Sequence, residues 1–186
     1  MDTNVPIRSR RRRRTSLTAA LAVAAMLSSA APAAACENAD AQISGASAGT
    51  LRSATLCLLN KRRTAHGLRR LRGDRDLREA AQRYAQDMVA RDFFSHVSPS
   101  GTDVVDRLKA SGFISPDESW LVGENLAWGS GALGTPRAIV RQWMNSAGHR
   151  DNILRGAFRH IGIGIAAGAP QPVSGSAATY ATNFGD

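Results

Sequence analysis

In the first half of the chain, apolar residues recur at the spacing of amphipathic helices. Residues 50–67 form the first such segment, and Gly67 ends it as glycine commonly ends a helix. The second segment can be capped by either Asp74 or Asp76. Its apolar stripe comprises Leu77, Ala80, Ala81, Tyr84, Ala85 and Met88. Such a stripe is typical of a helix face buried in a core, so we do not assign it to a cofactor.

Shorter segments follow. Turn formers make a loop of FSHVSPSG (94–101), and residues 103–112 predict a short helix closed by glycine. Residues 135–146 predict a further helix, with Pro136 in its first turn. This region therefore continues the helical part of the chain in smaller pieces.

The hydrophobic period changes to two near the C-terminus. HIGIGIAAG (160–168) alternates isoleucine with glycine, which predicts a strand whose glycine face lets a helix lie close. ATYATNFG (178–185) is a second strand after a loop rich in turn formers, and LVGENLAWG (121–129) is extended and apolar. Helices followed by a small antiparallel sheet, with one helix interposed, predict an α+β fold: an α–β–α sandwich with the sheet between helical layers.

The N-terminal region has the order of an export signal. Arg8 and Arg10 through Arg14 precede an Ala/Leu-rich stretch that ends in Ala33-Ala34-Ala35, a small-residue cleavage site. The apolar part is short for a retained membrane anchor. We therefore expect a secreted, extracellular protein with no transmembrane segment after cleavage.

This interpretation divides the chain into three parts. Residues 1–35 form the signal peptide, 36–49 a linker, and 50–186 one domain. Lipid anchoring through Cys36 is an alternative, although the small Ala33 stands where lipidation motifs usually carry a larger aliphatic residue.

The formal net charge of +9 is unevenly placed, because six arginines precede residue 15. From residue 36 onward, 18 Lys and Arg stand against 14 Asp and Glu. That excess is an ordinary solubility charge. No basic stripe interleaved with aromatic residues remains, so we expect no nucleic-acid partner.

The chain has two cysteines, Cys36 and Cys57. Export to an oxidising compartment favours a disulfide between them, which would stabilise the fold by about 3 kcal/mol. The alternative is a buried free Cys57 on a helix. Their spacing matches no metal motif.

Three residues from distant stretches carry the candidate chemistry: His96, Glu124 and His149. Glu124 stands alone in the apolar, glycine-bracketed run GENLAWG and needs a partner if it is buried. Two imidazoles and a carboxylate could bind zinc or another divalent cation with one position open. Without metal, Glu124 could accept a hydrogen bond from one histidine and act as a general base. The alternative is that neither histidine is functional and that each lies on the surface or forms a structural hydrogen bond.

Other chemistries have weaker support. Ser95 and Ser146 lie near the histidines, but no nucleophile-elbow or phosphate-loop motif accompanies them. His66 is expected at a helix C-terminus, and His160 at a strand start is more consistent with a structural role.

The ordered motifs FSHVSPSG, GENLAWG, WMNSAGHRDNIL, FRHIGIGIA and YATNFG resemble the bacterial branch of the CAP superfamily. That superfamily comprises cysteine-rich secretory proteins, antigen 5 and pathogenesis-related 1 proteins, and its domain is also called SCP. The resemblance covers about residues 50–186. It implies an α–β–α sandwich whose central cleft is lined by a His/Glu tetrad able to hold a divalent ion such as zinc. The matching positions are His96, Glu124 and His149.

The chain departs from this pattern at Ser146, a cleft-lining position where many eukaryotic members carry a second glutamate. Losing a carboxylate lowers the expected affinity for a divalent cation. We therefore favour a secreted module that binds a lipid, sterol, peptide or cell-wall fragment. The alternative is a metal-assisted hydrolase or peptidase, and a structural role in the envelope is a weaker third. The sequence decides neither catalysis nor oligomeric state.

Overall fold

The computed structural model describes residues 35–186, so the predicted signal peptide lies outside the described residues except for Ala35. The helices are α1 Ala48–Ala65, α2 Arg75–Ala90, α3 Val104–Ala110, the 3-10 turn η1 Gly131–Gly134, α4 Pro136–Asn145 and α5 Ala147–Leu154. The strands are β1 Arg72–Gly73, β2 Val122–Ser130, β3 His160–Ala167 and β4 Ala177–Gly185. Within this part of the chain, no helix is both long and apolar enough to cross a bilayer.

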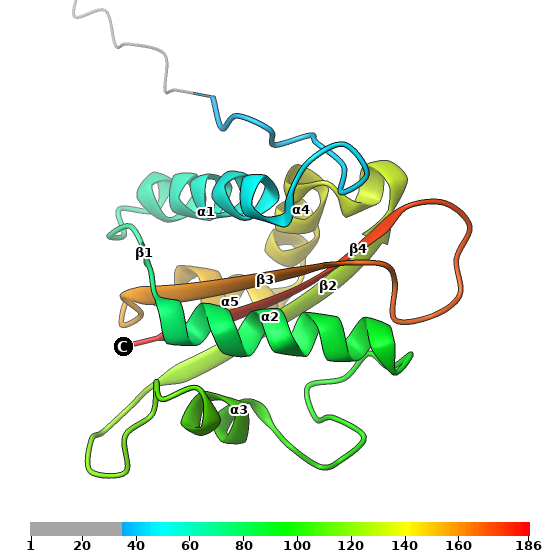
Figure 1. The fold of residues 1–186 in the computed structure, drawn as a ribbon. Coiled ribbons are helices and arrows are strands. Elements are labelled where there is room, and N and C mark those ends of the chain that lie inside the picture. The colour runs from blue at the N-terminus through cyan, green and yellow to red at the C-terminus, as the bar shows by residue number, and fades with distance from the viewer. Residues whose placement is uncertain (1–34) are drawn as a thin grey trace, which may run out of the picture. The chain divides into compact units, whose positions relative to one another are not determined.

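The four strands form one sheet in the order β1-β3-β4-β2. The three long strands pair antiparallel, as expected from the sequence. The short β1 adds one feature that was not expected, because it pairs parallel to β3 and makes the sheet mixed. Figure 1 shows α1 and α4 on one side of the sheet and α2 and α3 on the other. The predicted α+β sandwich is confirmed.

The glycine face of β3 lets α2 lie directly on the sheet. A Cβ at Gly162 would come within 2.0 Å of the Leu77 carbonyl carbon, and one at Gly164 within 2.2 Å of the Ala81 backbone. The helix begins where Asp74 accepts hydrogen bonds from the first free backbone N–H groups. The opposite face of β3 presents its isoleucines to α1 and α4 in the larger core cluster.

The segment before α1 is fastened to the domain. Cys36 and Cys57 form the predicted disulfide, with their Cα atoms 5.7 Å apart. Asp40 accepts two hydrogen bonds from the Arg137 guanidinium of α4, at 2.7 and 2.9 Å. Ile43 packs against the core. The disulfide, the ion pair and this apolar contact together hold the segment against the helices.

Candidate functional site

The buried acid Glu124 has both of its oxygens paired. Its side chain is only 2% exposed. His96 Nδ1 donates to Oε1 at 2.8 Å, and Arg107 Nη2 donates to Oε2 at 2.8 Å. Two charged or chargeable donors therefore offset the cost of burying this carboxylate.

Strand alternation and α5 fix the direction of the Glu124 side chain. Successive residues of a strand point to opposite faces. Glu124 reaches α3 and the loop before it, whereas the neighbouring Asn125 donates to the His149 carbonyl of α5 at 3.0 Å. Asn152 of α5 donates to the Glu124 carbonyl at 3.2 Å, which ties the start of β2 to that helix.

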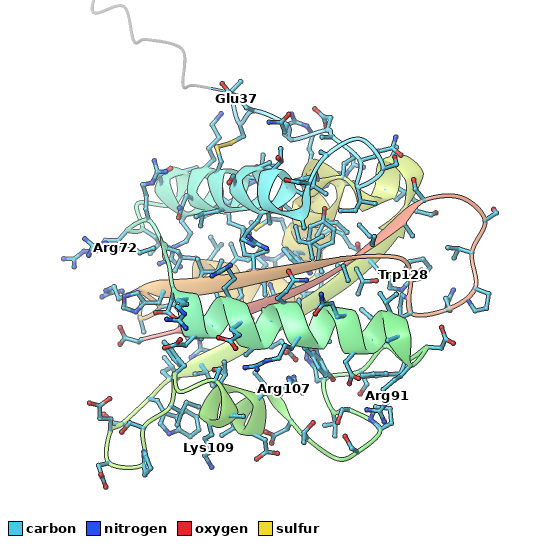
Figure 2. The ribbon with its side chains drawn as sticks, viewed as in Figure 1. Glu37, Arg72, Arg91, Arg107, Lys109 and Trp128 are labelled. Atoms are coloured by element: carbon cyan, nitrogen blue, oxygen red, sulfur yellow. A yellow bond between two sulfur atoms is a disulfide. The ribbon has the colours of Figure 1, made fainter. Side chains whose placement is uncertain are left out.

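Arg107 is the central residue of the site, and the sequence interpretation missed it. Its guanidinium also donates to the carbonyls of His96, at 3.2 Å, and Thr102, at 3.0 Å. Figure 2 shows Arg107 between α2 and α3. A capping box at Asp103 fixes the start of α3 and hence the position of this arginine. The available signal was that a buried acid requires a cation, but no spacing rule identifies which of the arginines supplies it.

Tyr84 of α2 supports Arg107 through its ring. The Arg107 Cζ lies 3.3 Å from the Tyr84 ring centroid, a cation–π contact. The Tyr84 hydroxyl donates to the Ser95 carbonyl at 2.6 Å, which anchors the loop that carries His96. Burial raises the pKa of Tyr84 to about 12, so the ring stays neutral.

The pKa values of the two histidines of the site are shifted in opposite directions. The His96 side chain is 59% exposed, and its hydrogen bond to Glu124 raises its pKa. Burial lowers the pKa of His149, and the charge of His96 lowers it further. His149 Nδ1 is buried without a hydrogen-bond partner. The structure therefore joins His96 to Glu124 directly, while His149 lies within electrostatic reach of His96 without bonding to either residue.

The remaining candidate residues, Ser146, Ser95, His66 and His160, lie at helix ends, in a turn and at the start of a strand. Ser146 forms the junction of α4 and α5, three residues before His149. Ser95 Oγ accepts a hydrogen bond from the Val97 N–H in a local turn. His66 caps the end of α1, and His160 opens β3 opposite Arg72, as expected for both.

The donor types at this site suit zinc, but their arrangement does not. Among residues 35–186, no three His, Cys, Asp or Glu side chains are grouped so that they could hold a metal ion. Arg107 also places a fixed positive charge on one oxygen of Glu124. The residues as arranged do not fit a three-ligand site, and zinc binding stays a prediction.

A cleft of about 350 Å³ opens between α2 and α3, beside this group. Tyr84 and Arg107 line it, together with Arg83, Asp87 and Thr102. Glu124 and His96 are not part of its lining. The cleft therefore meets the site through the guanidinium of Arg107.

The α–β–α sandwich, with Glu124 at the start of β2 paired to His96 from the loop before α3, agrees with the class of domain that the sequence resembles, the CAP or SCP domain. The sequence profile of CAP, the cysteine-rich secretory protein family, matches residues 56–181. The chain belongs to this family.

Relatives in bacteria support this assignment. The chain is 39% identical to YkwD of Bacillus subtilis (strain 168) over 107 residues, which are 58% of this chain and 39% of YkwD. It is 36% identical to the membrane protein YlbC of the same organism over 110 residues, 59% of this chain and 30% of YlbC. The chain thus spans less than half the length of these curated relatives.

Solved structures share the fold. An extracellular protein containing an SCP domain, from Bacillus anthracis str. Ames, superposes with a TM-score of 0.56 at 26% identity, covering 75% of this chain and 43% of the other. An outer surface protein of Borrelia burgdorferi gives a TM-score of 0.55 at 21% identity, covering 70% of this chain and 88% of the other. The second similarity concerns the fold alone.

Proposed function

We propose that this chain is an exported CAP-domain protein that binds a ligand beside His96 and Arg107 and does not hydrolyse it. The observation that carries the proposal is the burial of Glu124: its side chain is only 2% exposed, each oxygen has a donor at 2.8 Å, and it does not line the cleft beside Arg107. A general base needs a lone pair free to face water or substrate. Each Glu124 oxygen keeps a second lone pair, but the side chain is buried and does not line the cleft. Glu124 could therefore reach a water or a substrate only by moving away from its partners, which is costly for a charge this deeply buried.

The surface around His96 indicates the chemistry of the ligand. Phe94 is 48% exposed and Val97 is 47% exposed. These two apolar residues stand on either side of the exposed His96 in the sequence. Such a surface suits an amphiphile, with its apolar part on Phe94 and Val97 and an oxygen acceptor facing His96. Among lipid, sterol, peptide and cell-wall fragments, a lipid-like amphiphile matches this combination best.

Export is the second part of the proposal. The signal-like N-terminal sequence supports it, and so does the similarity to an SCP-domain protein described as extracellular. We do not advance a metal-assisted hydrolase or peptidase, because no observation at the site favours that chemistry over binding.

The proposal is tested by identifying what the exported protein carries. The full chain is expressed with its own N-terminus, purified from the medium, extracted with organic solvent and analysed by mass spectrometry. Phe94→Ser removes one apolar side chain beside His96. Leu133→Ser is the control, because Leu133 is 63% exposed and follows the opposite end of β2.

We expect an amphiphile in extracts of the parent and the Leu133 variant and little or none in the Phe94 variant. Equal extracts from all three proteins would contradict the proposed binding surface. Hydrolysis of casein or peptidoglycan that disappears in Glu124→Gln would show instead that Glu124 is catalytic. Retention of the protein inside the cell would contradict export.

A further inference from the structure

The fold gathers arginines at one edge of the sheet. We define the β1 arginine surface as Arg69, Arg70, Arg72, Arg75, Arg78 and Arg159. The first five are exposed and the last is half-buried. Arg72 of β1 pairs in register with His160 of β3, which brings the two chain segments side by side. Figure 2 shows Arg72 extending away from the domain at this edge.

The charge of this edge is not balanced locally. Residues 61–78 and 155–160 together contain ten Lys and Arg and two Asp, whereas the rest of 36–186 contains eight Lys and Arg and twelve Asp and Glu. Within the described part of the chain, none of the six arginines forms an ion pair. Of the two aspartates, Asp74 is engaged as the cap of α2. Asp186 is a further acid nearby, beyond the end of β4.

A buried cation lies beneath the surface. Arg63 of α1 is fully buried, and its guanidinium donates to four carbonyl groups at 2.8 to 3.1 Å. These carbonyls belong to Arg69, Ile153, Arg155 and Phe158, so Arg63 holds together the two loops that carry the surface. None of its partners is a carboxylate. A buried charge balanced only by carbonyl dipoles adds to the positive potential above it.

Like charges crowd one another here. Burial lowers the pKa of Arg63, and the charge of Arg159 lowers it further. Burial likewise lowers the pKa of Arg52, with a further contribution from Arg78. Folding has therefore assembled a repulsive cluster that an anionic partner would relieve.

The shape of the surface suits a chain of anions. One hollow, of about 680 Å³, is lined by Arg69, Arg70, Arg72, Arg159 and His160 together with Leu71. A second, of about 230 Å³, is lined by Arg52, Arg75, Arg78 and Asp74 among others. Consecutive residues of β1 line the two hollows, Arg72 the first and Gly73 the second. Guanidinium groups bind phosphate oxygens in bidentate fashion. Two neighbouring hollows can accept successive phosphates of one polymer.

We infer that the β1 arginine surface binds a soluble, phosphate-bearing polyanion. A bilayer fits less well, because peripheral membrane sites combine basic residues with inserted apolar side chains. The exposed large apolar residues of the described chain are Phe94, Val97, Trp120, Leu121, Leu133 and Val173. None of them belongs to residues 61–78 or 155–160, and Leu121, whose carbonyl accepts the Asp186 N–H, is separated from β3 by β4. This inference concerns a surface separate from the His96 site and does not depend on the function proposed for that site.

The test measures binding of end-labelled inorganic polyphosphate by fluorescence anisotropy from 50 to 300 mM salt. The variant is Arg69→Gln/Arg70→Gln/Arg72→Gln. The control is Arg83→Gln/Arg91→Gln/Arg141→Gln, which removes three exposed arginines elsewhere and changes the net charge equally. Thermal unfolding of each protein confirms that it is folded. Only side chains are exchanged, so the Arg69 carbonyl that receives Arg63 is retained.

We expect the surface variant to bind about tenfold more weakly or worse, with a salt dependence less steep by roughly two counterions. The control should stay within about twofold of the parent. Equal weakening in both variants would overturn the inference, since net charge alone would then explain binding. Polyglutamate of equal charge binding as tightly as polyphosphate, or vesicles of phosphatidylglycerol binding while polyphosphate does not, would also overturn it.

Discussion

Removing the guanidinium of Arg107 should destabilise the domain far more than removing a surface arginine. In Arg107→Met, the Glu124 carboxylate would keep His96 but lose its fixed counter-charge. The two side chains are 11% and 2% exposed, so solvent screens their interaction little. Breaking a buried ion pair typically costs about 3–5 kcal/mol. The substitution also removes the contact between Arg107 Cζ and the Tyr84 ring, 3.3 Å from the ring centroid. We include the energy of that contact in the same range. We expect the free energy of unfolding to fall by about 4 kcal/mol.

Urea unfolding at pH 7, followed by tryptophan fluorescence, measures this loss. Arg91→Met is the matched control: Arg91 also pairs with an acid, Asp87 at 3.4 Å, and lies 5.8 Å from the ring of Phe93. The two side chains of that pair are 42% and 33% exposed. We expect this control to cost less than about 1 kcal/mol.

A double variant separates lost packing from an unpaired charge. In Arg107→Met/Glu124→Gln the buried group is neutral, so the double variant should be more stable than Arg107→Met alone by about 2 kcal/mol. The reasoning would be refuted if Arg107→Met cost no more than the Arg91 control. It would also be refuted if adding Glu124→Gln made the Arg107 variant less stable, because Glu124 would then not depend on Arg107.

Three further predictions follow from the geometry. Reducing the disulfide with dithiothreitol should lower the free energy of unfolding by about 3 kcal/mol, seen as a lower urea midpoint; an unchanged midpoint would contradict this. Gly164→Ala should cost about 3 kcal/mol or more because its Cβ would lie 2.2 Å from the α2 backbone. Gly148→Ala, whose Cβ meets nothing within 4 Å, should be neutral or stabilising by up to about 1 kcal/mol. The raised pKa of His96 makes its bond to Glu124 stabilising below pH 6.5, and this contribution is lost as pH rises through the raised pKa. For His149, whose pKa is lowered, stability is instead lost as pH falls below 6.5. NMR titration should show the pKa of His149 rising in His96→Ala; if it does not move, the two histidines do not share a site.

The regular elements were predictable because their signals are local. The stripe and the aspartate cap of α2, and the alternation of β3, depend only on residues near one another in the chain. α5 was not predicted, since AGHRDNIL lacks an amphipathic period and only Ile153 of the helix is buried. β1 was missed for a related reason: two residues carry no period, and their strand partner lies nearly ninety positions away.

The site was predictable in part. An acid bracketed by apolar residues indicated that Glu124 would be buried and paired, and His96 is one of its partners. The other partner is chosen by the packing of α3 against α2, which no sequence spacing encodes. The β1 arginine surface has the same origin. Counting charges from residue 36 onward gives a small excess, but the register of β1 on β3 concentrates that charge at one edge.

Arg107 also changes the net charge of the predicted divalent-cation site. Carboxylate ligands strengthen the binding of a divalent cation, and the resemblance described above predicts a second glutamate where this chain has Ser146. Here one carboxylate, Glu124, faces one fixed cation. With Glu124 ionised, the group is neutral when His96 is neutral and positive when His96 is protonated. An arrangement whose charge is never negative disfavours a free cation and favours a neutral or anionic ligand. The electrostatics of this domain therefore agree with the binding role argued from the geometry of Glu124.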